Sequence, residues 1–227
     1  MGKLICIGGG EVPRIKNGIQ LPYETKEIDQ EIVRIANQKN PKLLFIGTAS
    51  YDSKEYFQAI QEIFENLGCS VSSLDLVDHE ITQCEIREKI LNTDIIYVGG
   101  GKTKFMLETW KKFGVDQLLL EAYEKGIVCS GLSAGSYCWF QWNYDLIEGL
   151  GIIHGINCVH YEQKEQKAKD QFFQVIQEKG LPGYALENCT ALEIIDGKEK
   201  IIKSNPNKNA YKIIYEDGQF RQIGYEN

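Results

Sequence analysis

The feature that most constrains the fold of this chain is a regular alternation of short apolar runs with segments that carry hydrophobic residues at helical spacing. The apolar runs cover residues 4–7, 43–46, 71–76, 94–98 and 127–130. Strands that alternate with helices in this way form a parallel sheet covered by helices on both faces. We therefore expect an α/β fold with a mostly parallel sheet, in a single domain over residues 1–227, which is long enough to bury one substantial core.

The C-terminal part of the chain has a different pattern. Short strand-like runs follow one another closely there, at residues 191–195, 201–203, 211–215 and 220–223. Turn residues such as Asp196-Gly197 and Asp217-Gly218 separate them, which is typical of hairpins. We expect the fold to end in an antiparallel hairpin extension.

The run at 127–130 leads into Gly131-Leu132-Ser133-Ala134-Gly135, which has the form G-x-S-x-G. This pattern is typical of a nucleophile elbow, a sharp strand-to-helix turn in which small neighbours let the chain hold a serine in a strained conformation. The carboxyl ends of parallel strands are where such sheets place their reactive groups. Ser133 is therefore the candidate nucleophile. The structural alternative is a turn that only connects a strand to a helix.

A serine hydroxyl needs a base to take its proton, so a histidine is required. His79 lies among acidic residues after the third run and is interpreted as a surface residue. His154 lies in a turn-like stretch, and His160 directly follows the strand-like run 156–159. We favour His160, because general bases in this fold class lie at the carboxyl ends of strands.

The group that orients the histidine is less constrained. Since no histidine follows His160, the long downstream Ser–acid–His order of the α/β-hydrolases does not apply. Glu187, at the end of the strand-like run 183–186, is the preferred carboxylate, and Asp145 is the competitor.

Two glycine-rich loops follow strand-like runs. Gly99-Gly100-Gly101 can bring backbone N–H groups close to a reacting oxygen, so Gly100 and Gly101, with the N–H of Ala134, are the candidate oxyanion hole.

The other loop, Gly8-Gly9-Gly10, lacks the spacing of a dinucleotide fingerprint, and Pro13 stands where its helix would begin. We expect no cofactor.

Composition excludes several other classes. A net charge of −7 without a basic stripe argues against nucleic-acid binding, and no apolar stretch is long enough for a membrane span or a signal peptide. The seven cysteines show no C-x-x-C pairs and the histidines no ligand spacing, so we expect reduced thiols, no metal site and a cytoplasmic protein.

In combination, the motifs resemble the peptidase E and cyanophycinase family of serine peptidases over most of the chain. The segments that carry the resemblance are Thr48-Ala49-Ser50 with Asp52, residues 97–103, residues 131–136, Gly149-Leu150-Gly151 leading to His160-Tyr161, and residues 183–187. The resemblance implies a flavodoxin-like fold shared with class I glutamine amidotransferases, with serine in place of their cysteine. It also implies Ser133 as nucleophile, His160 as general base, and Gly100 or Gly101 with Ala134 as oxyanion hole.

The resemblance departs from the family pattern at two places. Lys102 stands where the family usually has asparagine after the glycines, and some members carry the acid at the position of Asn188 rather than near Glu187. Members of the family cleave after aspartate in small peptides or cut a β-aspartyl-arginine polymer. We therefore expect a serine-type peptidase that hydrolyses short peptides, such as aspartyl dipeptides, by acyl transfer through Ser133.

Other functions on the same framework are an amidase or esterase, a cyanophycinase-like β-aspartyl peptidase, and a non-catalytic protein that binds small ligands. The expected partner is a small peptide substrate, with the chain acting as a monomer or homodimer.

Overall fold

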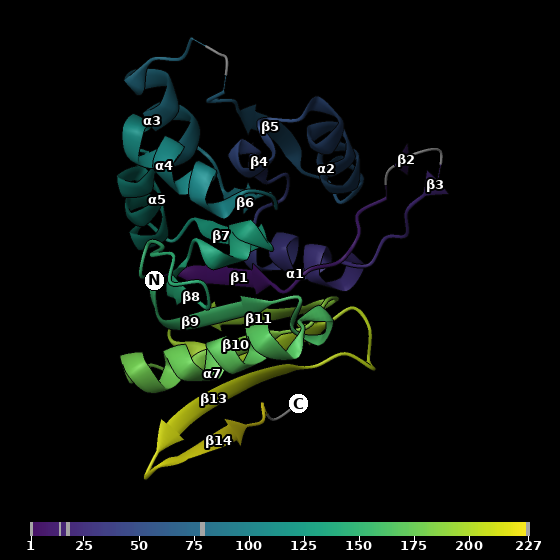
Figure 1. Ribbon diagram of the computed structural model, residues 1–227. Coiled ribbons are helices and arrows are strands. Elements are labelled where there is room, and N and C mark those ends of the chain that lie inside the picture. The colour runs from purple at the N-terminus through teal and green to yellow at the C-terminus, as the bar shows by residue number, and fades with distance from the viewer. Residues whose placement is uncertain (1, 14, 17–18, 78–79, 226–227) are drawn as a thin grey trace.

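A computed structural model describes residues 2–13, 15–16, 19–77 and 80–225 of the chain (Figure 1). Within these residues, the larger sheet has the strand order β12-β11-β1-β7-β6-β4-β5. Its strands are β1 (Lys3–Ile7), β4 (Lys42–Ile46), β5 (Ser70–Leu74), β6 (Ile95–Val98), β7 (Val128–Leu132), β11 (Thr190–Ile195) and β12 (Lys198–Lys203). Strands β1, β7, β6, β4 and β5 pair with one another in parallel, as the sequence predicts. Strand β11 pairs antiparallel with β1, and β12 pairs antiparallel with β11.

Helices cover both faces of this sheet. They are α1 (Lys26–Ala36), α2 (Lys54–Asn66), α3 (Gln83–Leu91), α4 (Thr103–Phe113), α5 (Val115–Glu124) and the short α6 (Ala134–Tyr137), with a 3-10 turn, η1 (Thr48–Ser50), after β4. Side chains alternate along β4: Leu43 and Phe45 pack with α1 and α2, whereas Leu44 and Ile46 pack with α3, α4 and α5. Because both faces are buried, the strand is apolar at every position after Lys42.

A second sheet lies beyond β1, on the side away from β5 (Figure 1). Its strands, in the order β14-β13-β10-β9-β8, are β8 (Phe140–Asn143), β9 (Ile153–Val159), β10 (Gly183–Leu186), β13 (Ala210–Glu216) and β14 (Gln219–Ile223). The 3-10 turn η2 (Tyr161–Gln163) follows β9, and α7 (Gln166–Lys179) packs its apolar face on this sheet. The sequence predicts the C-terminal hairpins, but in the structure they divide between the two sheets.

A small hairpin, β2 (Ile15–Lys16) with β3 (Ile19–Gln20), follows the first glycine loop. Among the described residues, no helix has the length and apolar character needed to cross a membrane. The chain thus forms the mixed α/β architecture that the sequence predicts, with a mostly parallel central sheet and flavodoxin-like character.

Candidate active site

Ser133 lies in a strained turn between β7 and α6. Its φ of 55° and ψ of −110° are unusual for a residue with a side chain. Both flanking glycines are required by close backbone contacts: a Cβ at Gly131 would overlap the backbone of Gly135, and a Cβ at Gly135 would overlap the backbone of Val98. The G-x-S-x-G pattern thus has a steric cause, and it places the serine at the carboxyl end of its strand.

His160 follows the end of β9 in the left-handed conformation, with φ 51° and ψ 39°. Its Nε2 lies 2.9 Å from the hydroxyl oxygen of Ser133. Two segments from different sheets therefore meet with hydrogen-bonding geometry between hydroxyl and imidazole. The competing histidine, His154, is exposed, and its Nδ1 lies 3.2 Å from Oε1 of Gln141. His79 lies outside the described residues.

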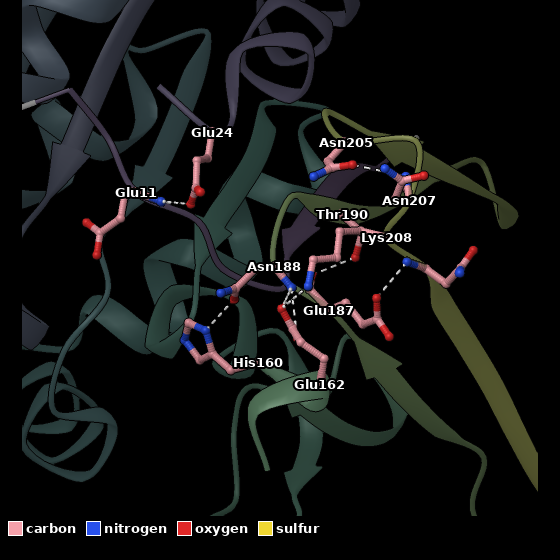
Figure 2. A network of polar contacts seen from close by, with 11 residues as sticks. Glu11, Glu24, His160, Glu162, Glu187, Asn188, Thr190, Asn205, Asn207 and Lys208 are labelled. Carbon is pink, nitrogen blue, oxygen red and sulfur yellow. Dashed lines mark hydrogen bonds and ion pairs between the residues drawn. The ribbon is translucent and has the colours of Figure 1, made fainter. Parts of the chain in front are cut away.

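The far nitrogen of the His160 ring contacts an amide and not the expected carboxylate. Oδ1 of Asn188 lies 2.6 Å from Nδ1 of His160 (Figure 2). The carboxylate of Glu187 instead accepts a hydrogen bond of 2.9 Å from the backbone N–H of Asn209. Glu187 and Asn188 lie in the turn between β10 and β11, where the two side chains have different partners and only the amide contacts the ring.

The alternative acid, Asp145, lies in an exposed turn at the mouth of the pocket, where its backbone N–H donates to Oδ1 of Asn143. No contact joins its carboxylate to His160 within the described residues. The structure therefore brings together Ser133, His160 and Asn188.

The asparagine determines the tautomer of the ring. An amide oxygen can only accept, so Nδ1 of His160 carries the proton and donates to Asn188. Nε2 is then free to accept the hydroxyl proton of Ser133. This is the tautomer that a general base requires.

The surroundings of His160 favour its neutral form. Burial is the largest cause that lowers its pKa below the ordinary 6.5, and the nearby charge of Lys164 acts in the same direction. The hydrogen bond to Asn188 and the charges of Glu162 and Glu11 act in the opposite direction without reversing the shift. The neutral ring, which is the form that can accept a proton, is thus the favoured one.

The first glycine loop, which the sequence does not connect with catalysis, organises these three residues. The backbone carbonyls of residues 7, 8 and 9 point to three different segments at the end of β1. In that order they accept hydrogen bonds from the backbone N–H groups of Ser133 at 3.1 Å, His160 at 3.0 Å and Cys189 at 2.9 Å. The end of β1 and the glycine loop that follows it therefore hold the backbone of Ser133, of His160 and of the residue next to Asn188. The sequence feature that could have indicated this role is the run of three glycines directly after a buried strand.

A second group fixes the position of Asn188. Both carboxylate oxygens of Glu162 accept from the backbone N–H of Asn188 at 3.1 Å, and Nζ of Lys208 lies 3.0 Å from the same carboxylate (Figure 2). No sequence pattern marks Glu162, because the residues it joins are far apart in the chain.

The second glycine loop lies beside the serine, since a Cβ at Gly100 would sit 3.3 Å from that of Ser133. The N–H of Gly100 donates to the hydroxyl of Tyr56 at 3.3 Å. The N–H groups of Gly101 and Ala134 donate to no protein group in the described part of the chain. Of the three candidate oxyanion donors, Gly101 and Ala134 are therefore the two whose N–H groups have no acceptor among the described residues.

Ser133, His160 and Gly101 border a pocket of about 330 Å³. It is lined by Gly101, Lys102, Thr103, Lys104, Ser133, Tyr137, Asn143, Tyr144, Asp145, Ile147, Val159, His160 and Lys164. Nζ of Lys164 donates to the hydroxyl of Tyr144 at 3.0 Å, which holds its charge at the pocket wall. In the described ranges, no three His, Cys, Asp or Glu side chains are grouped so as to hold a metal ion.

Comparison with known proteins places this arrangement in context. Residues 4–202 match peptidase family S51. The chain is 30% identical to the uncharacterized peptidase YgaJ of Bacillus subtilis strain 168, over 98% of this chain and 96% of that protein. It is 26% identical to the uncharacterized peptidase PM1590 of Pasteurella multocida, over 74% of this chain and 88% of that protein.

Two solved structures share the fold. A peptidase from an acI-B1 actinobacterium superposes with a TM-score of 0.73 at 20% identity, covering all of this chain and 95% of that one. A putative peptidase E protein from Listeria monocytogenes EGD-e superposes with a TM-score of 0.65 at 21% identity, covering 89% of this chain and 98% of that one.

Proposed function

This chain belongs to peptidase family S51, and from that premise we propose that it is a serine-type peptidase that hydrolyses short peptides by acyl transfer through Ser133. The observation that carries the proposal is the contact of 2.9 Å between Nε2 of His160 and the Ser133 hydroxyl, with Nδ1 held by Asn188. Membership of the family makes the chain a peptidase. The serine mechanism and the substrate are what we propose.

In this mechanism, His160 takes the hydroxyl proton of Ser133 as the oxygen attacks the scissile carbonyl. The negative oxygen of the tetrahedral intermediate accepts from the N–H groups of Gly101 and Ala134. The protonated His160 then donates to the leaving amine, and an ester to Ser133 remains. A water molecule, deprotonated by the same ring, hydrolyses the ester and restores the enzyme.

The pocket favours an acidic substrate. Lys102, Lys104 and Lys164 line it against one carboxylate, Asp145, although the chain as a whole carries a net charge of −7. A positive pocket on a negative protein attracts a small anion and holds its carboxylate. This supports short peptides that carry an acidic residue, with aspartyl dipeptides as the first choice.

The test is hydrolysis of a panel of dipeptides that differ in the first residue, including aspartyl, asparaginyl and alanyl peptides. We expect aspartyl peptides to be cleaved and Ser133→Ala to abolish their cleavage. Labelling of the wild-type protein by a serine-reactive phosphonate should map to Ser133. The matched control is Ser70→Ala, an exposed serine at the opposite end of the sheet, which should leave activity unchanged.

Other outcomes would identify the alternative functions. Turnover of simple amides or esters without peptides would indicate an amidase or esterase, and cleavage of β-aspartyl-arginine polymer would indicate a cyanophycinase-like activity. Full activity in Ser133→Ala would overturn the mechanism. Peptide binding without turnover or labelling would indicate a non-catalytic protein.

A further inference from the structure

A second cavity adjoins the catalytic pocket. It has a volume of about 320 Å³ and lies between α4 and the turn of residues 143–148. We call it the outer pocket; its lining residues are Lys104, Leu107, Glu108, Lys111, Leu146, Ile147 and Glu148. Lys104 and Ile147 line the catalytic pocket as well, so the two cavities share a wall. The outer pocket is therefore a direct neighbour of the catalytic pocket.

The outer pocket combines an apolar surface with a balanced charged rim. Leu107, Leu146 and Ile147 form the apolar part. The rim has two lysines and two glutamates, of which Lys104 and Glu108 lie 3.9 Å apart. Because the rim charges balance, the cavity offers no net attraction to an ion, in contrast to the three lysines and one aspartate of the catalytic pocket. Its chemistry suits an uncharged, apolar group.

Leu146 is presented to this cavity by a specific turn. It is 45% exposed and has a φ of 60°, a conformation that is rare for a bulky residue. Its N–H donates to the carbonyl of Asn143 at 3.0 Å, and the side-chain oxygen of Asn143 accepts from the N–H groups of Asp145 and Ile147 at 3.0 and 2.8 Å. Asn143 is itself buried at the end of β8. A buried side chain thus maintains a backbone conformation that exposes a leucine beside the catalytic pocket.

We propose that the outer pocket is a substrate subsite that binds an apolar side chain of the peptide whose scissile bond lies at Ser133. This inference rests on the proposed peptidase function and adds a second specificity to it: a carboxylate in the lysine-lined pocket and an apolar residue against Leu146. The two lining residues that the cavities share, Lys104 and Ile147, are what assigns the outer pocket to the same peptide chain. Covering Leu146 would also remove an exposed apolar side chain from water.

The test measures peptide binding to the Ser133→Ala variant by calorimetry, so that no turnover interferes. The probes are two matched pairs, Asp-Leu with Asp-Ser and Asp-Gly-Leu with Asp-Gly-Ser, which place the leucine at successive distances from the aspartate. We expect the leucine peptide of one pair to bind about tenfold more tightly than its serine partner, since burying a leucine side chain supplies that much affinity. The pair that shows the preference identifies the distance between the two subsites.

The decisive variant carries Leu146→Asn in addition to Ser133→Ala. Asparagine is chosen because it tolerates a positive φ, so the turn is preserved. It should abolish the preference for leucine and leave the affinity for the serine peptides unchanged. The matched control adds Ile223→Asn, a similarly exposed apolar residue on β14, and should keep the preference.

Equal binding of the leucine and serine peptides in both pairs, or a preference that survives Leu146→Asn, would overturn the subsite. If the wild-type protein hydrolyses aspartyl dipeptides in either case, the proposed function still stands. If no peptide binds and none is hydrolysed, both proposals are wrong.

Discussion

The Cα atom of Gly9 lies so close to the ring of His160 that one added methyl group would overlap it. The same methyl group would overlap Oδ1 of Asn188, because the two side chains meet directly above the glycine. Gly9 also has a φ of 151°, which side chains rarely adopt. The pair that orients the ring therefore depends on a residue without a side chain in a loop at the end of β1.

We predict that Gly9→Ala lowers kcat/KM for aspartyl dipeptides by about 100-fold, since displacing a catalytic group by about 1 Å has an effect of that size. Labelling by the phosphonate should slow in parallel. The control is Gly68→Ala, which also has a positive φ, of 91°, but has open space around it. That variant should lose some thermal stability and keep its kcat/KM. An equal loss of kcat/KM in both variants would show that backbone strain, and not displacement of His160, causes the loss. Full activity in Gly9→Ala would show that the contact has no catalytic role.

Replacing the amide at position 188 tests its role as the orienting group. Asn188→Asp places a negative charge against Nδ1, which stabilises the protonated ring, so the pKa of His160 should rise and the acid limb of kcat/KM should move to higher pH. Asn188→Leu has a similar volume but no acceptor, and we expect kcat to fall roughly 100-fold because the ring loses its orientation. Glu187→Gln is the matched control at the adjacent residue, whose carboxylate does not contact the ring. A larger fall in kcat for Glu187→Gln than for Asn188→Leu would contradict this assignment.

The charge of Lys164 tests the electrostatics of the base. Since this cation lowers the pKa of His160, Lys164→Met should raise it. A nuclear magnetic resonance titration of the His160 ring in the free protein measures the shift without substrate. Lys169→Met, five residues further along, removes a charge that lies over the ring of Tyr161 and should leave the titration of His160 in place. An unchanged His160 pKa in Lys164→Met would mean that burial alone keeps the ring neutral.

A buried carboxyl group away from the site predicts a pH-dependent stability. Asp29 is buried, accepts a hydrogen bond of 2.8 Å from the Thr25 hydroxyl, and has a pKa raised by burial from 3.8 to about 7. Between these values the unfolded chain releases a proton that the folded chain keeps, so this group lowers the free energy of unfolding as the pH rises from about 4 to about 7.

Asp29→Asn replaces the ionisable carboxyl group by an amide that stays neutral at every pH of the experiment. We expect little change in the free energy of unfolding near pH 4 and a stabilisation on the order of 4 kcal/mol at about pH 8, measured by urea unfolding. Asp217→Asn is the control, because its side chain is 90% exposed. A stabilisation that is larger at low pH than at high pH would disprove the prediction.

Local sequence patterns determined much of this protein. The run Leu43–Ile46 predicts a strand buried on both faces because each of its side chains is apolar, and helices cover both faces in the structure. The spacing of Gly131, Ser133 and Gly135 predicts a strained turn at a strand end, because only small residues allow the backbone contacts found there. These features depend on neighbours in the chain, which is why the sequence reveals them.

Contacts between distant segments were decided only by the tertiary structure. Whether Glu187 or Asn188 faces His160 depends on the path of the turn between β10 and β11, which no local pattern specifies. The carbonyls of residues 7–9 acquire their role only when three strand ends from two sheets meet around them. The sequence by itself therefore determined the strands, the elbow and the serine. The pairing of the two sheets decided what surrounds the imidazole, because hydrogen bonds between remote segments leave no periodic pattern in the chain.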